Sequence, residues 1–381
     1  MIEQPRADDA SALYIGLISG TSADGIDAAL VRFEQDKPQL VHAVTHAWPE
    51  ALRTQILRVA QDEEKLDLDA YGRLDTAIGQ TFADAVDALL AQSGATAAAV
   101  RAVGSHGQTI RHRPFGEYPF TLQIGNASVI AERSGIHVVA DFRSADVAAG
   151  GQGAPLLPAV HAMLLRAGGH TRVVLNLGGI ANITVLSANG QVFGFDTGPA
   201  NGLMDAWCFR HRGEAFDRDG AFAASGRVDD TLLAALLSDA YFALPPPKST
   251  GREHFHLGWL DARLRCASLS PADVQATLLE LTARSIADAI DTHASDAVDV
   301  LLCGGGVHNA LLVRRLQELL HTRTLRSTAD YGVDPDYLEA TAFAWLARQR
   351  LLGLPGNLPA VTGARGFRVL GAIYPAPRSA D

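Results

Sequence analysis

A short segment near the N-terminus combines glycines, hydroxyl groups and carboxylates in a pattern suited to phosphate chemistry. Its Gly-x4-Gly spacing is that of a P-loop, but Ile26 and Asp27 stand where a P-loop has Lys-Ser/Thr, which disfavours a P-loop NTPase. Small residues still let backbone N–H groups approach phosphate oxygens, and two hydroxyl side chains add donors. An ordinary hairpin turn is the alternative interpretation. The candidate phosphate-binding residues are Gly20, Thr21, Ser22, Ala23, Asp24, Gly25, Ile26 and Asp27.

The same segment offers candidate metal ligands. Mg²⁺ prefers carboxylate, water and phosphate oxygens, so Asp24 or Asp27 could hold this ion directly or through water. The sequence does not decide between the two aspartates.

Asp196 is the best candidate for a general base. It lies in Gly194-Phe-Asp-Thr-Gly-Pro-Ala-Asn201, where an apolar strand is predicted to end, a glycine turn follows and a helix begins. A carboxylate in this position is well placed to face a cleft and to take a proton from a hydroxyl group or a water molecule. The alternative is that Asp196 only caps the helix that follows.

Two further glycine clusters follow apolar strands. Gly304, Gly305 and Gly306 come after a predicted strand at 298–303 and before a helix that starts near 309. Glycines permit the close approach of a flat or phosphorylated ligand, and a nucleotide is the obvious candidate; close packing of the helix on the strand is the alternative. Gly178 and Gly179 form a turn after a strand, as Gly20 does in the first half of the chain.

Arg143 is a candidate substrate contact, because it precedes the glycine-rich stretch 149–155 and could pair with a carboxylate. A salt bridge between domains is the alternative. The histidine pairs 106/112 and 254/256 lack a third matched ligand, which disfavours a zinc site. Neither Gly-x-Ser-x-Gly nor Gly-x-Gly-x-x-Gly occurs, so hydrolase and Rossmann dehydrogenase interpretations lack their usual markers.

The elements that must position these residues occur twice in the same order. Strands predicted at 13–18, 26–33 and 40–47 are followed by helices at 50–61 and 70–92, and strands at 172–176, 183–186 and 192–195 are followed by a helix near 201. This order predicts two related α/β domains, each with a mixed sheet, whose first glycine turns face each other across a cleft. A short strand is predicted at 102–104, before Ser105-His106-Gly107. Later segments predict helices at 271–294, 309–321 and 336–352 and a strand at 367–374.

Composition excludes several classes of protein. With 381 residues and 48% hydrophobic against 19% charged residues, the chain has material for two packed cores. A net charge of −10 without a basic run disfavours a nucleic-acid partner. Three dispersed cysteines, Cys208, Cys266 and Cys303, favour a reducing compartment. No apolar run reaches the length of a membrane helix, so we expect a cytoplasmic protein without a membrane partner.

Ten segments, taken in order, make the sequence similar to one known family. The chain resembles the anhydro-N-acetylmuramic acid kinases from about residue 13 to residue 375. It departs from the family pattern at Ala23, where leucine is usual, and at Ala200, where glycine is common. The ten segments are 20–27, Ser105-His-Gly-Gln-Thr109, Gln123-Ile-Gly-Asn126, Ala140-Asp-Phe-Arg143, Gly150-Gly-Gln-Gly-Ala-Pro155, Asn176-Leu-Gly-Gly-Ile-Ala-Asn182, Phe195-Asp-Thr-Gly-Pro-Ala-Asn201, Pro247-Lys-Ser-Thr-Gly-Arg-Glu253, Cys303-Gly-Gly-Gly306 and Glu339-Ala-Thr-Ala-Phe-Ala344.

This resemblance implies a fold and a reaction. The fold is α/β, with two actin-like (ribonuclease H-like) domains whose mixed sheets flank an ATP cleft; we expect them at 1–143 plus 362–381 and at 144–361. The enzyme would use ATP and Mg²⁺ to open the ring of 1,6-anhydro-N-acetylmuramic acid with water and phosphorylate O6, giving N-acetylmuramic acid 6-phosphate and ADP in cell-wall recycling. A homodimer is also implied.

The resemblance also implies residue roles. Residues 20–27 and the later glycines would bind ATP, Asp196 would be the catalytic base, and Arg143 and Glu339 would contact the sugar. Another sugar or acyl-phosphate kinase of the same fold, or an actin-like filament or chaperone ATPase, remains an alternative.

Overall fold

The structure is a computed structural model that describes residues 12–20, 22–34, 36–61, 65–251, 254–264 and 269–377. The chain divides into two compact units, Met1–Val160 with Tyr337–Asp381, and His161–Asp336. The sequence predicted other boundaries and placed 144–160 and 337–361 in the second domain. The difference arises because a C-terminal helix, α12 (Leu338–Leu352), packs against the sheet of the first unit.

The first unit is built on a seven-stranded mixed sheet. Along the sheet the order is β12-β6-β4-β1-β2-β3, and β5 pairs with β4 outside this path. Strand β1 is antiparallel to β2 and parallel to β4, while β2 and β3 form a hairpin. The strands are β1 (Leu13–Ser19), β2 (Ile26–Glu34), β3 (Lys37–His46), β4 (Val100–Arg113), β5 (Phe120–Ile124), β6 (Val138–Ala140) and β12 (Ala372–Tyr374).

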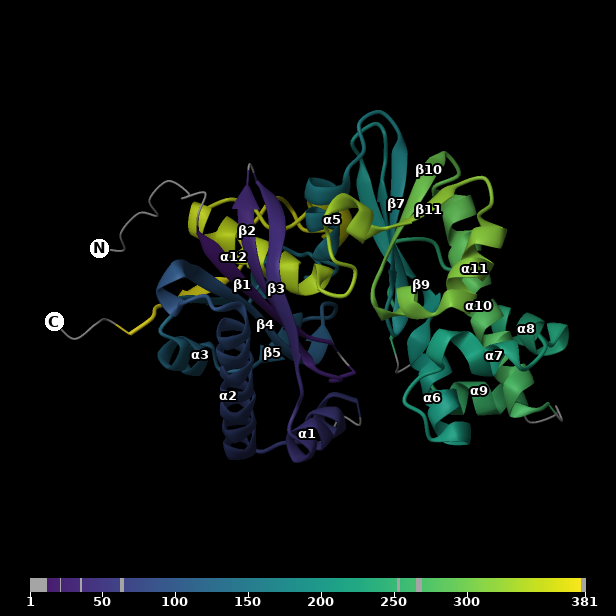
Figure 1. Cartoon of the computed structure of the whole chain (residues 1–381), viewed down its shortest axis with the longest axis horizontal. Coiled ribbons are helices and arrows are strands. Elements are labelled where there is room, and N and C mark those ends of the chain that lie inside the picture. Colours follow the sequence, from purple (N-terminus) through teal and green to yellow (C-terminus); the bar gives the residue numbers. More distant parts are fainter. Residues whose placement is uncertain are drawn as a thin grey trace. The chain divides into compact units, whose positions relative to one another are not determined.

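Strand β1 is a central strand, and all seven of its residues are buried. Helix α12 crosses this part of the sheet, in contact with β1, β2 and β4 (Figure 1). Gly16 of β1 and Gly104 of β4 are paired in register beneath the helix. A Cβ atom at Gly16 would fall on the carbonyl oxygen of Ala340, and one at Gly104 on that of Phe343. Glycine at both positions therefore lets the helix backbone approach the sheet directly.

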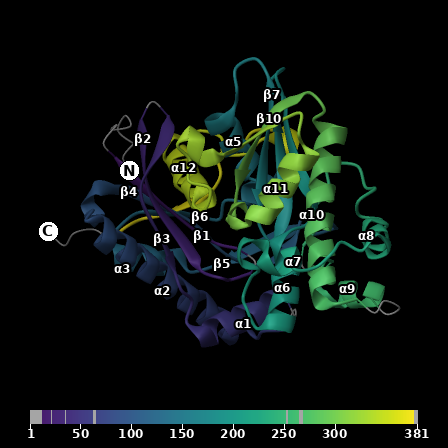
Figure 2. The ribbon, with the colours of Figure 1, turned by 45° about the vertical axis from the view of Figure 1, so that its right-hand side comes forward.

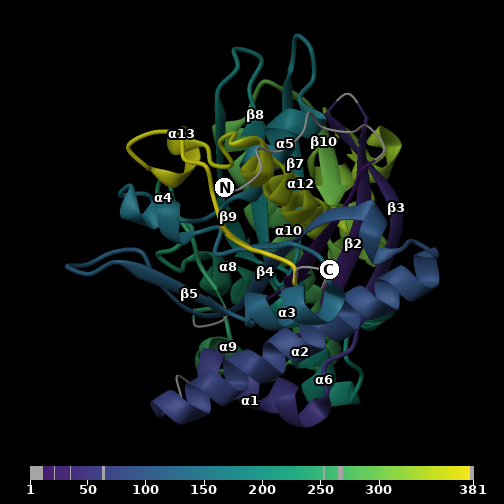
Figure 3. The same cartoon turned by 90° about the vertical axis from the view of Figure 1, so that its left-hand side faces the viewer.

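Two helices of the first unit, α2 (Leu68–Ser93) and α3 (Ala127–Ser134), begin and end at recognisable capping signals. Asp67 accepts a hydrogen bond from the N–H of Ala70 at the start of α2, and Gly94 ends that helix with φ +70°. Figure 3 shows α2 beside α3, and α4 close to α13. The remaining α-helices of the first unit are α1 (Glu50–Gln61), α4 (Ser144–Ala148) and α13 (Pro359–Thr362); α5 (Leu157–Leu165) begins in the first unit and ends in the second.

The second unit has a five-stranded mixed sheet in the order β11-β10-β7-β8-β9. Strands β7, β8 and β9 are successive antiparallel neighbours, and β10 is parallel to β7. Helix α10 contacts β8 and β9 and also packs against α11 (Figure 2). The strands are β7 (Thr171–Leu177), β8 (Ile180–Leu186), β9 (Val192–Pro199), β10 (Ala297–Cys303) and β11 (Thr324–Ser327). The helices are α6 (Asn201–Arg212), α7 (Ala221–Ala224), α8 (Asp230–Leu237), α9 (Leu257–Leu264), α10 (Pro271–His293) and α11 (Ala310–Leu319).

The predicted duplication is confirmed. Each unit opens with three antiparallel strands, β1-β2-β3 and β7-β8-β9, and each adds a later strand parallel to the first, β4 and β10. The predicted α/β class with two mixed sheets is therefore correct. Several predicted strands had wrong lengths, and the largest differences are at β4 and at the tail: β4 continues through the Ser105–Thr109 motif to Arg113, because its second half pairs with β5, and the tail forms only β12. Within the described ranges, no helix combines the length and apolar character needed to cross a bilayer.

Candidate active site

The turn after β1 contains the predicted phosphate-binding residues. The Gly20 carbonyl accepts the Ala23 N–H at 3.1 Å and the Gln108 side-chain amide at 3.1 Å, which fixes the turn against β4. Ala23 is fully buried in the left-handed region, with φ 49°, so this departure from the family pattern occupies a strained backbone position. Gly25 approaches Thr45 so closely that a Cβ atom would lie 2.6 Å from its Cγ2. Thr21 lies outside the described residues.

The two aspartates of this turn have different surroundings. Asp24 is exposed and forms an ion pair with Arg53 at 3.2 Å. Asp27 lies in β2 and accepts a hydrogen bond of 2.7 Å from the Thr45 hydroxyl. Among the described residues, no group of three or more His, Cys, Asp or Glu side chains gathers as a metal cage. Mg²⁺ does not require one, because it commonly takes one or two carboxylates together with phosphate and water oxygens.

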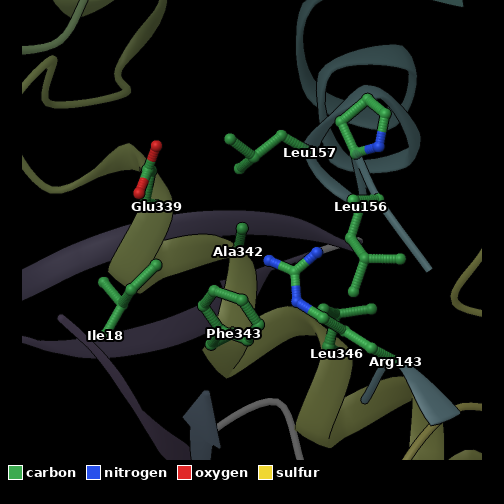
Figure 4. A pocket seen from close by; sticks show the side chains of 10 residues that line it. Ile18, Arg143, Leu156, Leu157, Glu339, Ala342, Phe343 and Leu346 are labelled. Atoms are coloured by element: carbon green, nitrogen blue, oxygen red, sulfur yellow. The ribbon is translucent and has the colours of Figure 1, made fainter. Parts of the chain in front are cut away.

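A pocket in the first unit brings together the two predicted sugar contacts. Arg143 and Glu339 both line a cavity of about 170 Å³ whose other walls are apolar. In Figure 4 the two charged side chains approach this cavity from different sides, with Ala342 and Phe343 of α12 between them. The complete lining is Ile18, Arg143, Ala154, Pro155, Leu156, Leu157, Glu339, Ala342, Phe343 and Leu346. Arg143 was a candidate from its own sequence context and Glu339 from the family resemblance, and the two lie far apart in the chain.

Arg143 is held in place by a buried histidine. Its Nε and Nη2 atoms each lie 3.0 Å from Nε2 of His106, and its Nη1 donates to the Gly153 carbonyl at 2.8 Å. Nδ1 of His106 lies 2.9 Å from the carbonyl oxygen of Gly107, which can only accept, so the proton is on Nδ1 and Nε2 accepts from Arg143. Burial, with the charge of Arg143 as a second cause, holds the pKa of His106 well below its ordinary value. The imidazole is therefore neutral.

Burial also lowers the pKa of Arg143, to about 10, although the charges of Glu339 and Asp146 oppose this effect. The guanidinium stays protonated at neutral pH and can pair with an anion. The alternative interpretation from sequence was a structural salt bridge. The hydrogen bonds of Arg143 instead run to a neutral ring and a carbonyl oxygen, which orient its charge without neutralising it.

The loop that carries Gly153 is fixed by a fully buried carboxylate. Asp146 accepts hydrogen bonds from the Gly153 N–H at 2.7 Å, the Asn357 amide at 2.7 Å and the Thr362 hydroxyl at 2.8 Å. These bonds tie the pocket loop to the segment around α13. A buried charge needs such partners, and here they position the carbonyl that orients Arg143.

In the second unit, Asp196 lies within β9 and does not cap a helix. The strand continues to Pro199, and the residue that precedes α6 is Ala200, without a side-chain cap. The capping interpretation is therefore wrong, and the predicted end of the strand came too early. One Asp196 carboxylate oxygen, Oδ2, accepts a hydrogen bond of 3.0 Å from the backbone N–H of Thr250.

The glycines predicted to bind nucleotide come together in the second unit. The carbonyls of Gly178 and Gly179 accept the backbone N–H groups of Asn201 and Ala200 at 3.0 and 3.1 Å, so this turn lies at the start of α6. A Cβ atom at Gly306 would lie 2.6 Å from Leu177 and 3.0 Å from the Asn201 amide. Gly304, with φ +81°, begins the same loop, and Gly305 is exposed. The segments 177–179, 200–201 and 304–306 therefore lie next to one another.

Several supporting residues had no assigned role from sequence reasoning. His106 was noted only as half of a weak histidine pair and as part of a family motif, and Asp146, three residues after Arg143, was assigned no role. Tyr241 carried no signal at all. Lys248 and Thr250 lie in the motif 247–253, whose Arg252 and Glu253 are outside the described residues. The spacing of that motif gave no hint that it contacts Asp196.

Comparison with known proteins gives one consistent answer. The family model described as anhydro-N-acetylmuramic acid kinase matches residues 12–376. A protein of that name from Xanthomonas campestris pv. campestris (strain 8004) is 58% identical over 369 residues, covering 96% of this chain and 98% of its own length. Proteins of the same name from Chromohalobacter salexigens and Pasteurella multocida are 54% and 50% identical, with 95% and 96% of this chain and 99% and 98% of their own lengths covered.

Proposed function

This chain belongs to the anhydro-N-acetylmuramic acid kinase family, and from that membership we propose that it couples hydrolysis of a 1,6-anhydro sugar to phosphorylation. It is a kinase that acts on a small molecule. The proposed substrates are 1,6-anhydro-N-acetylmuramic acid, water and ATP, and the products are N-acetylmuramic acid 6-phosphate and ADP. The proposed role is the recycling of cell-wall fragments in the cytoplasm. A homodimer, without a nucleic-acid or membrane partner, stays a prediction.

The observation that carries this proposal is the pocket with one guanidinium and one carboxylate between apolar walls. A muramic acid carries a lactyl carboxylate, which Arg143 can bind through a charge-assisted hydrogen bond. Glu339 can accept hydrogen bonds from sugar hydroxyl or amide N–H groups. Apolar walls suit the carbon faces of a bridged sugar that exposes few hydroxyl groups. A sugar without the lactyl group would leave the Arg143 charge unpaired.

The proposed reaction balances with one base. Asp196 takes a proton from water as the water oxygen attacks C1, and the bond between C1 and O6 breaks. The released O6 attacks the γ-phosphorus of ATP, and ADP leaves with the electron pair of the broken P–O bond. Asp196 later returns its proton to solvent. Phosphoryl transfer of this kind depends mainly on positioning and electrostatic stabilisation.

The two candidate metal ligands have different surroundings: Asp24 shares its charge with Arg53, and Asp27 accepts a hydrogen bond from the Thr45 hydroxyl. We propose that Asp24 or Asp27 holds Mg²⁺, directly or through water. When bound, Mg²⁺ would neutralise charge on the ATP phosphates. Activity that survives complete chelation with EDTA would contradict this part of the proposal.

Substitution of Asp196 tests the coupled reaction. Asp196→Asn keeps the shape of the side chain but removes the base, so ring opening and phosphorylation should fall together, by about 100-fold or more. In heavy-oxygen water the wild-type enzyme should place the label at C1 of the sugar and none in the phosphate. Label in the phosphate would indicate hydrolysis of ATP before transfer. ATP consumption without a sugar phosphate would favour the actin-like ATPase alternative.

The turn at Gly20 allows a separate test of ATP binding. Among the described residues, a Cβ atom at Gly20 would meet only the Ser22 hydroxyl, at 3.8 Å, so there is room for a β-carbon in the fold and Gly20→Val is a suitable test. Its side chain would nevertheless obstruct the approach of phosphate oxygens to the backbone. We expect a raised KM for ATP with little change in the KM for the sugar, measured by steady-state kinetics. An unchanged KM for ATP would remove this turn from the ATP site.

A further inference from the structure

One chain segment makes three hydrogen bonds to Asp196. The Tyr241 hydroxyl donates to the Asp196 carbonyl oxygen at 2.6 Å, and the Asp196 N–H donates to the Lys248 carbonyl oxygen at 3.2 Å. The third bond is the one from the Thr250 N–H to Oδ2, at 3.0 Å. Both the backbone and the carboxylate of Asp196 are thus held from residues 239–251, which we call the Asp196 strap.

The strap is anchored independently of Asp196. Asp239 is a largely buried carboxylate at the start of the strap, and it accepts hydrogen bonds from three side chains that follow the strap in the chain: His254 at 3.1 Å, Trp259 at 2.8 Å and Arg263 at 2.8 Å. It also accepts the backbone N–H of Tyr241 at 3.0 Å. Asp239 therefore closes the strap into a loop whose ends cannot separate without exposing a charge.

Lys248 stiffens the middle of the strap. Its Nζ donates to the carbonyl oxygens of Tyr241 and Phe242, both at 3.2 Å, and lies 4.7 Å from the centre of the Tyr241 ring. A cation over an aromatic face adds attraction. The ring of Tyr241 also packs edge-on against Phe255 at 5.5 Å. The tyrosine therefore has a fixed ring, and its hydroxyl points at one backbone atom of the base.

We propose that Tyr241 and the Thr250 N–H are positioning groups that fix the Asp196 carboxylate in the orientation required to take a proton from water. This inference rests on the proposed function, because it presumes that Asp196 is the base. Burial, with the charge of Asp196 as a second cause, keeps the pKa of Tyr241 far above its usual range, so the hydroxyl is a donor at every working pH. Small displacements of a reacting group cost large factors in rate.

Tyr241→Phe tests the first group, because it removes only the hydroxyl and keeps the packed ring. We expect kcat to fall by about tenfold or more, with the KM values for sugar and ATP within about twofold of wild type. The matched control is Tyr331→Phe in the same unit. It removes a hydroxyl that bonds Arg172 at 2.8 Å and lies remote from Asp196 in the sheet, on the β10–β11 side. The control should lose stability but keep kcat.

Thr250 tests the second group. Thr250→Pro removes the N–H donor, whereas Thr250→Ala keeps it. A backbone N–H favours the ionised carboxylate, so the acid limb of the kcat–pH profile should move to higher pH by about one unit in the proline variant. The alanine variant should keep the acid limb of the wild type. A purely structural role would not shift this limb.

The outcomes separate this inference from the proposed function. An active Asp196→Asn enzyme would overturn the assignment of the base, whatever the strap variants do. If Asp196→Asn is inactive but Tyr241→Phe keeps the wild-type kcat, only the positioning inference fails. It also fails if Tyr241→Phe and Tyr331→Phe lose kcat equally, in step with their folded fractions. If Thr250→Pro does not fold, the comparison of Tyr241→Phe with its control Tyr331→Phe decides whether the positioning inference holds.

Discussion

Arg143 depends on an acceptor that carries no charge. Replacing His106 by leucine would leave two guanidinium N–H groups unpaired in a buried site, at a cost of about 1–3 kcal/mol. We expect His106→Leu to raise the KM for the sugar by about tenfold or more and to leave the KM for ATP nearly unchanged. His106→Gln, which can supply an amide oxygen, should recover part of the loss. Steady-state kinetics with each substrate varied would check this, and equal increases in both KM values would contradict it.

A second histidine links stability to pH. His161 is fully buried; its Nδ1 bonds the Thr184 hydroxyl at 2.9 Å, and its Nε2 has no partner among the described residues. Burial lowers the pKa of His161 to about 3. Between about pH 3 and pH 6.5, His161 is therefore protonated in the unfolded chain and neutral in the folded chain. The free energy of unfolding rises with pH over this range.

This linkage gives a measurable slope. From pH 7 to pH 5, His161 alone should remove about 2 kcal/mol from the free energy of unfolding of the second unit. Urea unfolding at both pH values should show the loss. His161→Gln should reduce it, while His321→Gln, at an exposed site, should not. A variant slope equal to that of the wild type would mean that the side chain titrates normally in the fold.

Residue types and spacing singled out Asp196 and Arg143 as candidates, and the family resemblance added Glu339, but neither indicated the residues that hold these side chains in place. Asp196, Arg143 and Glu339 each lie in a motif that can be recognised along the chain. The contacts of His106, Asp146 and Tyr241 are made across 37, 211 and 45 residues. Such contacts depend on strand register and loop path, which local sequence does not encode. Arg143 and Glu339 were grouped through the family resemblance, since nothing in their spacing joins them.

At the scale of elements, the contact between α12 and the sheet is set by two glycines. In Gly16→Ala, the new methyl group would meet the backbone oxygen of Ala340, so the helix must move away from β1. We expect a loss of about 3 kcal/mol, at the upper end for an overpacked core. Gly72→Ala, on the exposed side of α2 with nothing within 4 Å, should stabilise by about 0.5–1 kcal/mol. If Gly16→Ala and Gly72→Ala changed the free energy of unfolding by denaturant equally, the close contact between α12 and β1 would be disproved.

Elements were predicted best where apolar runs are unbroken. Strands β1, β7 and β10 follow such runs and lie within a few residues of their expected positions. Strand β4 was cut short in the prediction because Ser105, His106 and Gln108 look like loop residues. In the fold all three are buried; His106 and the amide nitrogen of Gln108 have hydrogen-bond partners, whereas the Ser105 hydroxyl has none among the described residues. Polar residues inside a buried strand interrupt the apolar pattern from which strands are predicted.

At the scale of the whole molecule, the two units differ in how the chain builds them. The second unit is one continuous stretch, and its core residues all lie between Val173 and Leu320. The first unit needs α12, which arrives only after the second unit is complete. This discontinuity also explains the misplaced boundaries, because the apolar pattern of a helix does not tell which sheet it covers.

The discontinuity predicts unequal fragments. Residues 157–336, expressed alone, should show a cooperative thermal transition by circular dichroism. Residues 1–160 alone should not, because β1 and β4 would expose the face that α12 covers. Co-expression of 1–160 with 337–381 should restore a transition. A cooperative melt of 1–160 by itself would show that α12 is dispensable for the first unit.

The glycine contact beneath α12 also restricts which substitutions this sequence can accept during evolution. A larger side chain in a core is often accommodated when a neighbouring side chain becomes smaller. At positions 16 and 104 the obstructing atoms include backbone oxygens of the helix, which no substitution can remove. A second mutation can therefore compensate for a change in the side chains around these sites, but none can compensate for replacing the glycines themselves. In a library selected only for folding, both positions should remain glycine while neighbours such as Leu17 and Val103 exchange in volume-matched combinations.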